Sequence, residues 1–182
     1  MPQSPRPKPQ IYTFRVRILG GYYAPPDSTA IWRDIEIPAN QTLADLGHAI
    51  PLAFDFGDAH LWAFFLNGKA WDSASEYSLR MDPGPPDESA ASDAAGTLIR
   101  DVPFPGKTGK AEFLFLFDFG DEWHFGVKLR NIRENTETRA RFPRIVAEHG
   151  AAPPQYPSEE DWDDDDGDDD DDDEEVAGEN KV

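Results

Sequence analysis

The chain has no cysteine among its 182 residues, which excludes disulfides and thiolate metal sites. It also has no apolar window approaching the roughly 20 residues that a membrane helix needs. The first ten residues, MPQSPRPKPQ, contain no apolar stretch of the kind found in signal peptides. These absences predict a soluble, cytoplasmic protein that does not associate with membranes.

Basic residues are also scarce, with 17 Lys and Arg against 36 Asp and Glu, for a net charge of −19. The excess is local, because residues 159–182 hold 16 of the acidic residues and one basic residue. A run of like charges with few apolar side chains repels itself and cannot form a core. We therefore predict a flexible Pro-rich arm over residues 1–10, one domain over residues 11–157 and a disordered acidic tail over residues 158–182.

Alternating apolar and polar residues predict two strands near the N-terminus, Ile11–Leu19 and Ile31–Ile37, paired as a long-looped hairpin. Apolar residues then recur at helical spacing from Leu43 to Phe54. Thr42 and Asp45 have the spacing of an N-cap and its capping box. Pro51 is expected to end or kink this helix near Ile50.

Further strands are predicted at His60–Leu66 and Lys69–Ser73, joined by the hairpin signal Asn67-Gly68. Residues 74–96 are polar and predict a loop, and Thr97–Val102 predicts one helical turn. A last hairpin is predicted over residues 112–130 around the turn Asp118–Asp121. This order predicts an α+β fold, a β-grasp-like and mainly antiparallel sheet with one principal helix.

A set of short motifs is distributed along the chain: Ile31-Trp32-Arg33, Pro38-Ala39, Thr42-Leu43-x-x-Leu46, His60-Leu61-Trp62-x-Phe64, Phe117-Asp118-Phe119-Gly120-Asp121-x-Trp123, Phe142-Pro143 and Pro153-Pro154. Together they resemble the plasmid pRiA4b ORF-3-like family, which includes proteins described as transposon-passenger or TnpR-type. The resemblance implies a prokaryotic protein, often near mobile elements, without an established biochemical role. Two positions depart from the family pattern: Phe125 stands where many members have His, and Ala152 where many have Cys.

The candidate site begins with Asp118 and Asp121, which flank the last turn. One interpretation is a carboxylate pair for acid–base or metal chemistry, with His60 and His124 as neighbours. The other is turn chemistry, in which Asp accepts backbone N–H groups and Gly120 supplies a positive φ. The four histidines and the absent cysteines leave no ligand spacing typical of zinc, so no metal or other cofactor is predicted.

Two other features offer partner surfaces. Trp32, Trp62, Trp71 and Trp123 form either an aromatic binding face or part of the core. Trp62 and Trp123 are included in the candidate functional surface. The stretch 128–144 holds six basic residues, Arg139 and Arg141 among them, against two glutamates. It is either a patch for nucleic acid or an acidic partner, or a solvated strand end and loop. The acidic tail offers a third possibility, because it can fold back onto this patch.

No nucleophile–base pair or ligand set is evident, so we interpret the chain as a non-enzymatic interaction or accessory module of a prokaryotic, mobile-element-linked system. Its partner is predicted to be another protein, with no prediction of oligomeric state. One alternative is a nucleic-acid-associated accessory protein of a transposon or plasmid, although a net charge of −19 disfavours DNA binding by the full-length chain. Another is a hydrolytic or metal-dependent enzyme that uses Asp118, Asp121 and His60.

Overall fold

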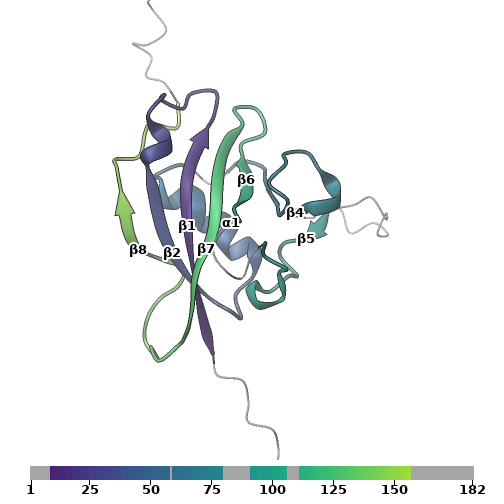
Figure 1. Cartoon of the computed structure of the whole chain (residues 1–182), viewed down its shortest axis with the longest axis vertical. Helices are drawn as coiled ribbons and strands as arrows, with labels where there is room; N and C mark the ends of the chain where they lie inside the picture. The colour runs from purple at the N-terminus through teal and green to yellow at the C-terminus, as the bar shows by residue number, and fades with distance from the viewer. Residues whose placement is uncertain (1–8, 58, 80–90, 106–110, 157–182) are drawn as a thin grey trace, which may run out of the picture.

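Eight strands form a single sheet in the order β5-β4-β3-β6-β7-β1-β2-β8 (Figure 1). The computed structural model describes residues 9–57, 59–79, 91–105 and 111–156. All neighbouring strands are antiparallel except β4 and β5. The strands are β1 (Gln10–Gly20), β2 (Trp32–Pro38), β3 (Trp62–Phe65), β4 (Glu76–Ser78), β5 (Ser92–Asp93), β6 (Phe113–Phe117), β7 (Trp123–Glu134) and β8 (Arg144–His149).

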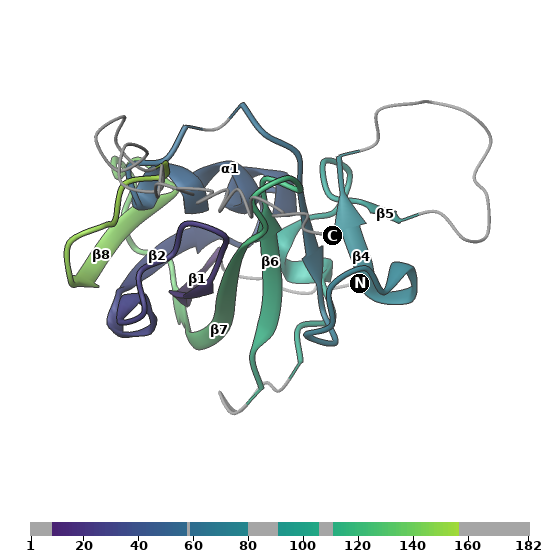
Figure 2. The same cartoon turned by 90° about the horizontal axis from the view of Figure 1, so that it is seen from above.

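One α-helix, α1 (Leu43–Ala53), lies across one face of this sheet, as Figure 2 shows. Its N-terminus carries the predicted capping box, because the Thr42 side chain accepts from the Asp45 N–H and the Asp45 carboxylate accepts from the Thr42 N–H. The helix does not end at Ile50 but continues through Pro51 to Ala53. The buried Arg33 donates from Nε to the Ala53 carbonyl, which is one of the carbonyls that a helix end leaves without an intrahelical partner.

The core lies between α1 and the sheet. Aromatic residues dominate it, and Phe113, Phe115 and Phe117 of β6 share it with Trp123 and Phe125 of β7. The register of β6 and β7 confirms the predicted last hairpin, with Phe117 opposite Trp123. Together with the β1–β2 hairpin and α1, this confirms a mainly antiparallel α+β fold.

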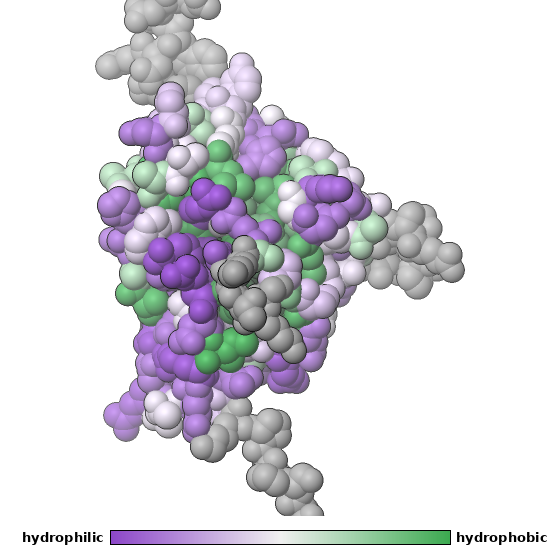
Figure 3. All heavy atoms as spheres, viewed as in Figure 1, coloured by the Kyte–Doolittle hydropathy of each residue, from purple (hydrophilic) through white to green (hydrophobic). Residues whose placement is uncertain are grey.

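The face of the sheet away from α1 is mixed in character (Figure 3). A small apolar cluster sits on β3 and β6, around Phe65 and Leu116. Over the neighbouring strands, Arg15 pairs with Asp34 at 2.8 Å and Arg17 pairs with Glu112 at 2.9 Å. This face is therefore closed partly by ion pairs rather than by a second layer.

The hairpin predicted at Asn67-Gly68 has a different return strand. Residues 69–73 form no strand, and β3 pairs instead with β4, beyond a ten-residue connection. The Asn67 side chain accepts from the Lys69 N–H and donates to Asp72, while Trp71 takes a positive φ of 65°. These contacts hold a wide turn in place of a two-residue one. The predicted loop at 74–96 accordingly contains β4 and β5, whereas the short helical turn near Ile99 is present.

Strand β8 was not predicted, because its residues follow a charged stretch and show no clean alternation. It pairs with β2 at the edge of the sheet, with a bulge opposite Asp34 and Ile35. The acidic tail predicted at 158–182 lies outside the described residues. Within the described part of the chain, no helix has the length and apolar character needed to cross a membrane.

Candidate functional site

The turn between β6 and β7, residues 118–122, is here called the acidic turn. The Asp118 carboxylate accepts the Gly120 N–H at 3.2 Å, and the Glu122 N–H donates to the Asp118 carbonyl at 2.7 Å. The positive φ values fall on Asp118 (57°) and Glu122 (49°), not on Gly120 as expected. Aspartate tolerates this left-handed conformation because its short side chain bonds the nearby backbone. Turn formation therefore accounts for much of what Asp118 does.

The structure brings His60 to Asp118, with 3.0 Å between the imidazole Nδ1 and the carboxylate Oδ2. A residue that the sequence did not single out completes the cluster: the Tyr156 hydroxyl lies 3.0 Å from His60 Nε2 and donates to Asp118 Oδ2 at 3.3 Å. Gln155 supports it, because its amide donates to the Tyr156 hydroxyl and accepts the Gly57 N–H. The cluster thus attaches the segment after β8 to the acidic turn and to the α1–β3 loop.

The electrostatics of the cluster do not favour nucleophilic chemistry. Burial and the charge of Asp118 raise the pKa of Tyr156 above its usual range, so its hydroxyl stays protonated and acts as a donor. Burial and the neighbouring Asp118 also raise the pKa of Asp121, an effect that His60 partly offsets. Asp121 and Asp118 are therefore close enough to repel, as a carboxylate pair does. Among the described residues, no group of three or more His, Asp or Glu side chains is placed to hold a metal ion.

Trp62 and Trp123 are not surface residues, which corrects their place among the candidates. Both side chains are buried in the core, Trp123 completely and Trp62 against α1, where Gly47 leaves room for its ring. A buried indole is not accessible to a partner, so these residues build the sheet rather than read a ligand. Trp32 lies under the Arg15 guanidinium at 3.6 Å, and Trp71 packs edge-on against Phe119 while remaining half exposed. His124 borders a hollow of about 290 Å³ beside Asp121.

Fewer basic side chains of the stretch 128–144 are free to contact a partner than its sequence suggests. Arg133 and Arg144 both donate to Glu36 and to Glu137, forming a closed four-residue network. Arg139 and Arg141 are exposed on the β7–β8 loop, and no carboxylate of the described residues lies within ion-pair distance of either. The expectation that the full-length chain does not bind duplex DNA at physiological salt stays a prediction.

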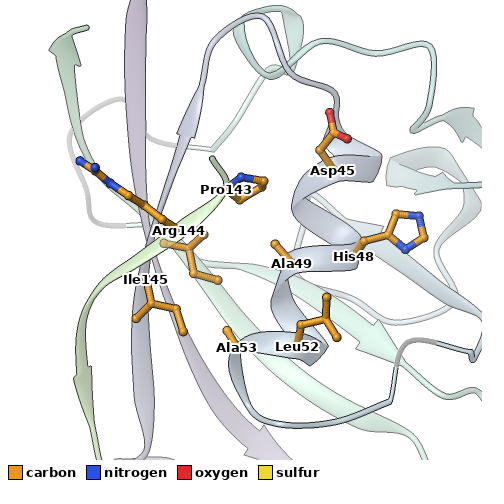
Figure 4. A pocket seen from close by; sticks show the side chains of 9 residues that line it. Asp45, His48, Ala49, Leu52, Ala53, Pro143, Arg144 and Ile145 are labelled. Atoms are coloured by element: carbon orange, nitrogen blue, oxygen red, sulfur yellow. The ribbon is translucent and has the colours of Figure 1, made fainter. Parts of the chain in front are cut away.

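A groove that sequence reasoning missed lies between α1 and β8 (Figure 4). It has a volume of about 440 Å³; its lining residues are Ile35, Asp45, His48, Ala49, Leu52, Ala53, Pro143, Arg144 and Ile145. We call it the α1–β8 groove. Leu52 is 55% exposed and Ile145 is 44% exposed, so two large apolar side chains border it while remaining half open to solvent. The Arg144 side chain turns away toward Glu36.

One sequence signal for this groove existed. Ile145 and Val146 are adjacent apolar residues inside a charged segment, and Leu52 falls outside the core stripe of the predicted helix. Each pattern alone is common on protein surfaces. Leu52 and Ile145 come together only in the folded chain, where both line the same groove.

The comparison with family models matches residues 11–161 to the plasmid pRiA4b ORF-3-like protein family. The chain belongs to this family. The match spans β1 through β8, including the acidic turn and Tyr156, so it covers both the cluster and the groove. It confirms the resemblance drawn from the sequence motifs.

Among solved structures, this chain is similar to the crystal structure of the protein of unknown function MM3350 from Methanosarcina mazei Go1. The two are 27% identical, with a TM-score of 0.61, over 82% of this chain and 75% of that one. No curated protein matched the chain. The comparisons therefore fix family and fold without naming a reaction or a ligand.

Proposed function

We propose that this pRiA4b ORF-3-like protein is an interaction module that binds another protein through the α1–β8 groove. The observation that carries the proposal is the pair Leu52 and Ile145, half exposed on facing sides of one hollow. Burying apolar area of this kind gains roughly 25 cal/mol per Å². Exposed apolar residues that converge on a groove are the usual mark of a protein contact.

The groove also suggests what its partner carries. Its walls are mainly apolar, whereas Arg141 lies two residues before Pro143 at the groove's β8 side. A partner segment with one or two large apolar side chains followed by carboxylates fits both features. Strand addition along β8 contributes less, because the bulge at β2–β8 interrupts the regular edge. The description of the module as β-grasp-like is likewise a proposal, supported by a hairpin followed by a helix across the sheet.

The chain offers a closely matched control for the test. Leu52 and Leu61 are 55% and 53% exposed, but only Leu52 borders the groove. We expect quantitative affinity capture from the native host to recover the same proteins with the unmodified chain and with Leu61→Asp, and to lose them with Leu52→Asp. Both variants should lose a similar, small amount of stability in urea unfolding, because each replaces a leucine that is about half exposed. Equal capture by both variants would remove the groove from the function.

A second candidate is an enzyme that uses Asp118, Asp121 and His60, and the observation in its favour is the 3.0 Å contact of His60 with Asp118. Its test is a broad hydrolase screen, with and without added Mg²⁺ or Zn²⁺, on the parent and on Asp118→Asn. Asparagine preserves the turn but cannot act as a general base. A turnover that this substitution abolishes without loss of stability would favour the enzyme.

A further inference from the structure

The loop between β1 and β2 meets the acidic turn at the upper end of the sheet in Figure 1. The Tyr22 N–H donates to the Asp121 carbonyl at 2.8 Å, which joins the two segments. Gly21 lies directly on the Trp123 ring, since a Cβ at that position would come within 3.0 Å of it. The hollow of about 290 Å³ beside Asp121 lies at this junction, and we call it the Tyr22 hollow. Its walls are therefore fixed by the fold.

One wall of the hollow is an aromatic ring held out into solvent. Tyr22 is 79% exposed, more than any other large apolar side chain of the described residues. It packs edge-on against Tyr23 at 4.8 Å between ring centroids, and Tyr23 packs edge-on against Tyr156 at 6.2 Å. The face of an aromatic ring is electronegative and attracts cations. A ring that is already held in place loses little conformational freedom when a ligand binds.

The other walls carry carboxylates that the fold leaves without a cation. Asp121 and Glu122 both line the hollow. Within the described part of the chain, no Lys or Arg side chain forms an ion pair with either of them. Asp118 differs, because it contacts His60 and Tyr156. Burial and the charge of Asp118 raise the pKa of Asp121, so a cation brought into the hollow relieves a repulsion that is already present.

We propose that the Tyr22 hollow binds an arginine side chain of a partner protein, with the guanidinium group against the Tyr22 ring and paired with Asp121 and Glu122. The carboxylates determine the sign of the ligand's charge, and the exposed ring favours a planar cation. Arginine meets both requirements, because its guanidinium group stacks on aromatic faces and donates two parallel hydrogen bonds to a carboxylate. This contact is separate from the α1–β8 groove and does not depend on the proposed function.

The test uses the full chain and the peptide acetyl-Gly-Gly-Arg-Gly-Gly-amide, titrated at low salt while amide chemical shifts are recorded. We expect saturable shifts at residues 21–22 and 120–124. The same peptide with citrulline, the uncharged analogue of arginine, should cause none. Tyr22→Leu should raise the Kd about two- to fivefold, the range expected for an exposed cation–π contact, whereas Tyr22→Phe should leave it nearly unchanged.

A pair of double variants separates the carboxylates of the hollow from the overall charge. Asp121→Asn with Glu122→Gln should raise the Kd at least about tenfold, because charge-assisted hydrogen bonds are lost. The matched control, Asp101→Asn with Glu134→Gln, removes the same charge from two residues that do not line the hollow and should leave the Kd unchanged. The acidic residues beyond position 158 are present in every variant, so they cannot cause a difference between the two pairs.

Four outcomes would overturn the inference. They are shifts confined to residues 158–182, equal shifts from the citrulline peptide, an equal Kd for a lysine peptide, and equal effects of the two double variants. The first would assign the arginine to the acidic tail, and the third would show that the hollow selects charge without selecting the planar group. Capture with Leu52→Asp judges the proposed function separately, because Leu52 does not line the Tyr22 hollow.

Discussion

The acidic turn and the α1–β8 groove differ in what their side chains already contact. In the turn, Asp118 binds the Gly120 N–H, His60 and Tyr156 within the same molecule. In the groove, Leu52 and Ile145 remain half exposed. Polar groups that satisfy one another have little free energy to gain from a partner, whereas half-exposed apolar surface gains by being covered.

Most residues that are conspicuous in the sequence are therefore not the ones that the fold leaves open to a partner. Asp, His and Trp attract a chemical interpretation, yet here most of them build a turn, attach a segment or fill the core. The groove depends on leucine, isoleucine and alanine, which no motif marks. Four substitutions or conditions test the contrast, in order of falling effect.

The largest effect is expected at Arg33, which joins α1 to the end of β8 and so fixes the groove. It is only 4% exposed, and it donates to the Ala53, Trp32, His149 and Gly150 carbonyls. Hydrogen bonds to charged groups contribute about 1.5–3 kcal/mol each, so Arg33→Met should cost at least about 3 kcal/mol in urea unfolding. Arg15→Met, at a partly exposed ion pair, should cost about 1 kcal/mol or less. Similar costs would mean that Arg33 is not the link we describe.

Acid should loosen the start of β8. Hydrogen bonds from Arg133 lower the pKa of Glu36, and those from Arg144 lower the pKa of Glu137. Because the folded-state values lie below the unfolded ones, this stabilisation is complete above about pH 4.5 and disappears as pH falls through the folded values. Urea midpoints between pH 7 and pH 3 should fall less steeply for Glu36→Gln than for the parent. Parallel curves would contradict the network.

A smaller loss is expected in the acidic turn at Asp118. Asp118→Ala places alanine at a φ of 57° and removes the acceptor for Gly120, at a combined cost of about 1–2 kcal/mol. Asp118→Asn keeps both the tolerated conformation and the acceptor, so it should lose well under half as much. Thermal unfolding of the two variants measures the difference. Equal losses would show that the carboxylate charge, not the turn, is what matters.

The smallest effect is expected at Asp121, and its sign is opposite. Since burial and Asp118 raise its folded pKa, its charged form is disfavoured in the folded chain at neutral pH. Asp121→Asn should therefore leave the thermal midpoint at pH 7 unchanged or slightly higher. The difference should shrink as pH falls through the folded pKa and be absent below the ordinary value of 3.8. A marked drop in the midpoint would show that the ionised carboxylate makes a contact that stabilises the turn.

The predictable parts of the fold were those fixed by local pattern. Alternation placed β1, β2 and the β6–β7 hairpin, and Thr42 with Asp45 placed the start of α1. The prediction of a return strand directly after Asn67-Gly68 was wrong, because the Asn67 side chain donates a hydrogen bond to Asp72 and the turn is wider. Strand β8 pairs with β2, and Tyr156 contacts His60, so each depends on residues about 100 positions earlier in the chain. A local sequence pattern does not reveal contacts between residues so far apart in sequence.

The place of β1 in the sheet has a consequence for synthesis on the ribosome. Its two neighbours are β2, which follows directly, and β7, which is complete only at Glu134. At a synthesis rate of about 5–20 residues per second, the edge of β1 that pairs with β7 stays unpaired for on the order of 5–25 s. During that interval the nascent hairpin presents an open edge, which invites pairing with other chains. Arg15 and Arg17 occupy alternate positions on β1. Before β7 is made, their charges disfavour pairing of this open edge with other chains, and in the folded protein the same two residues form ion pairs.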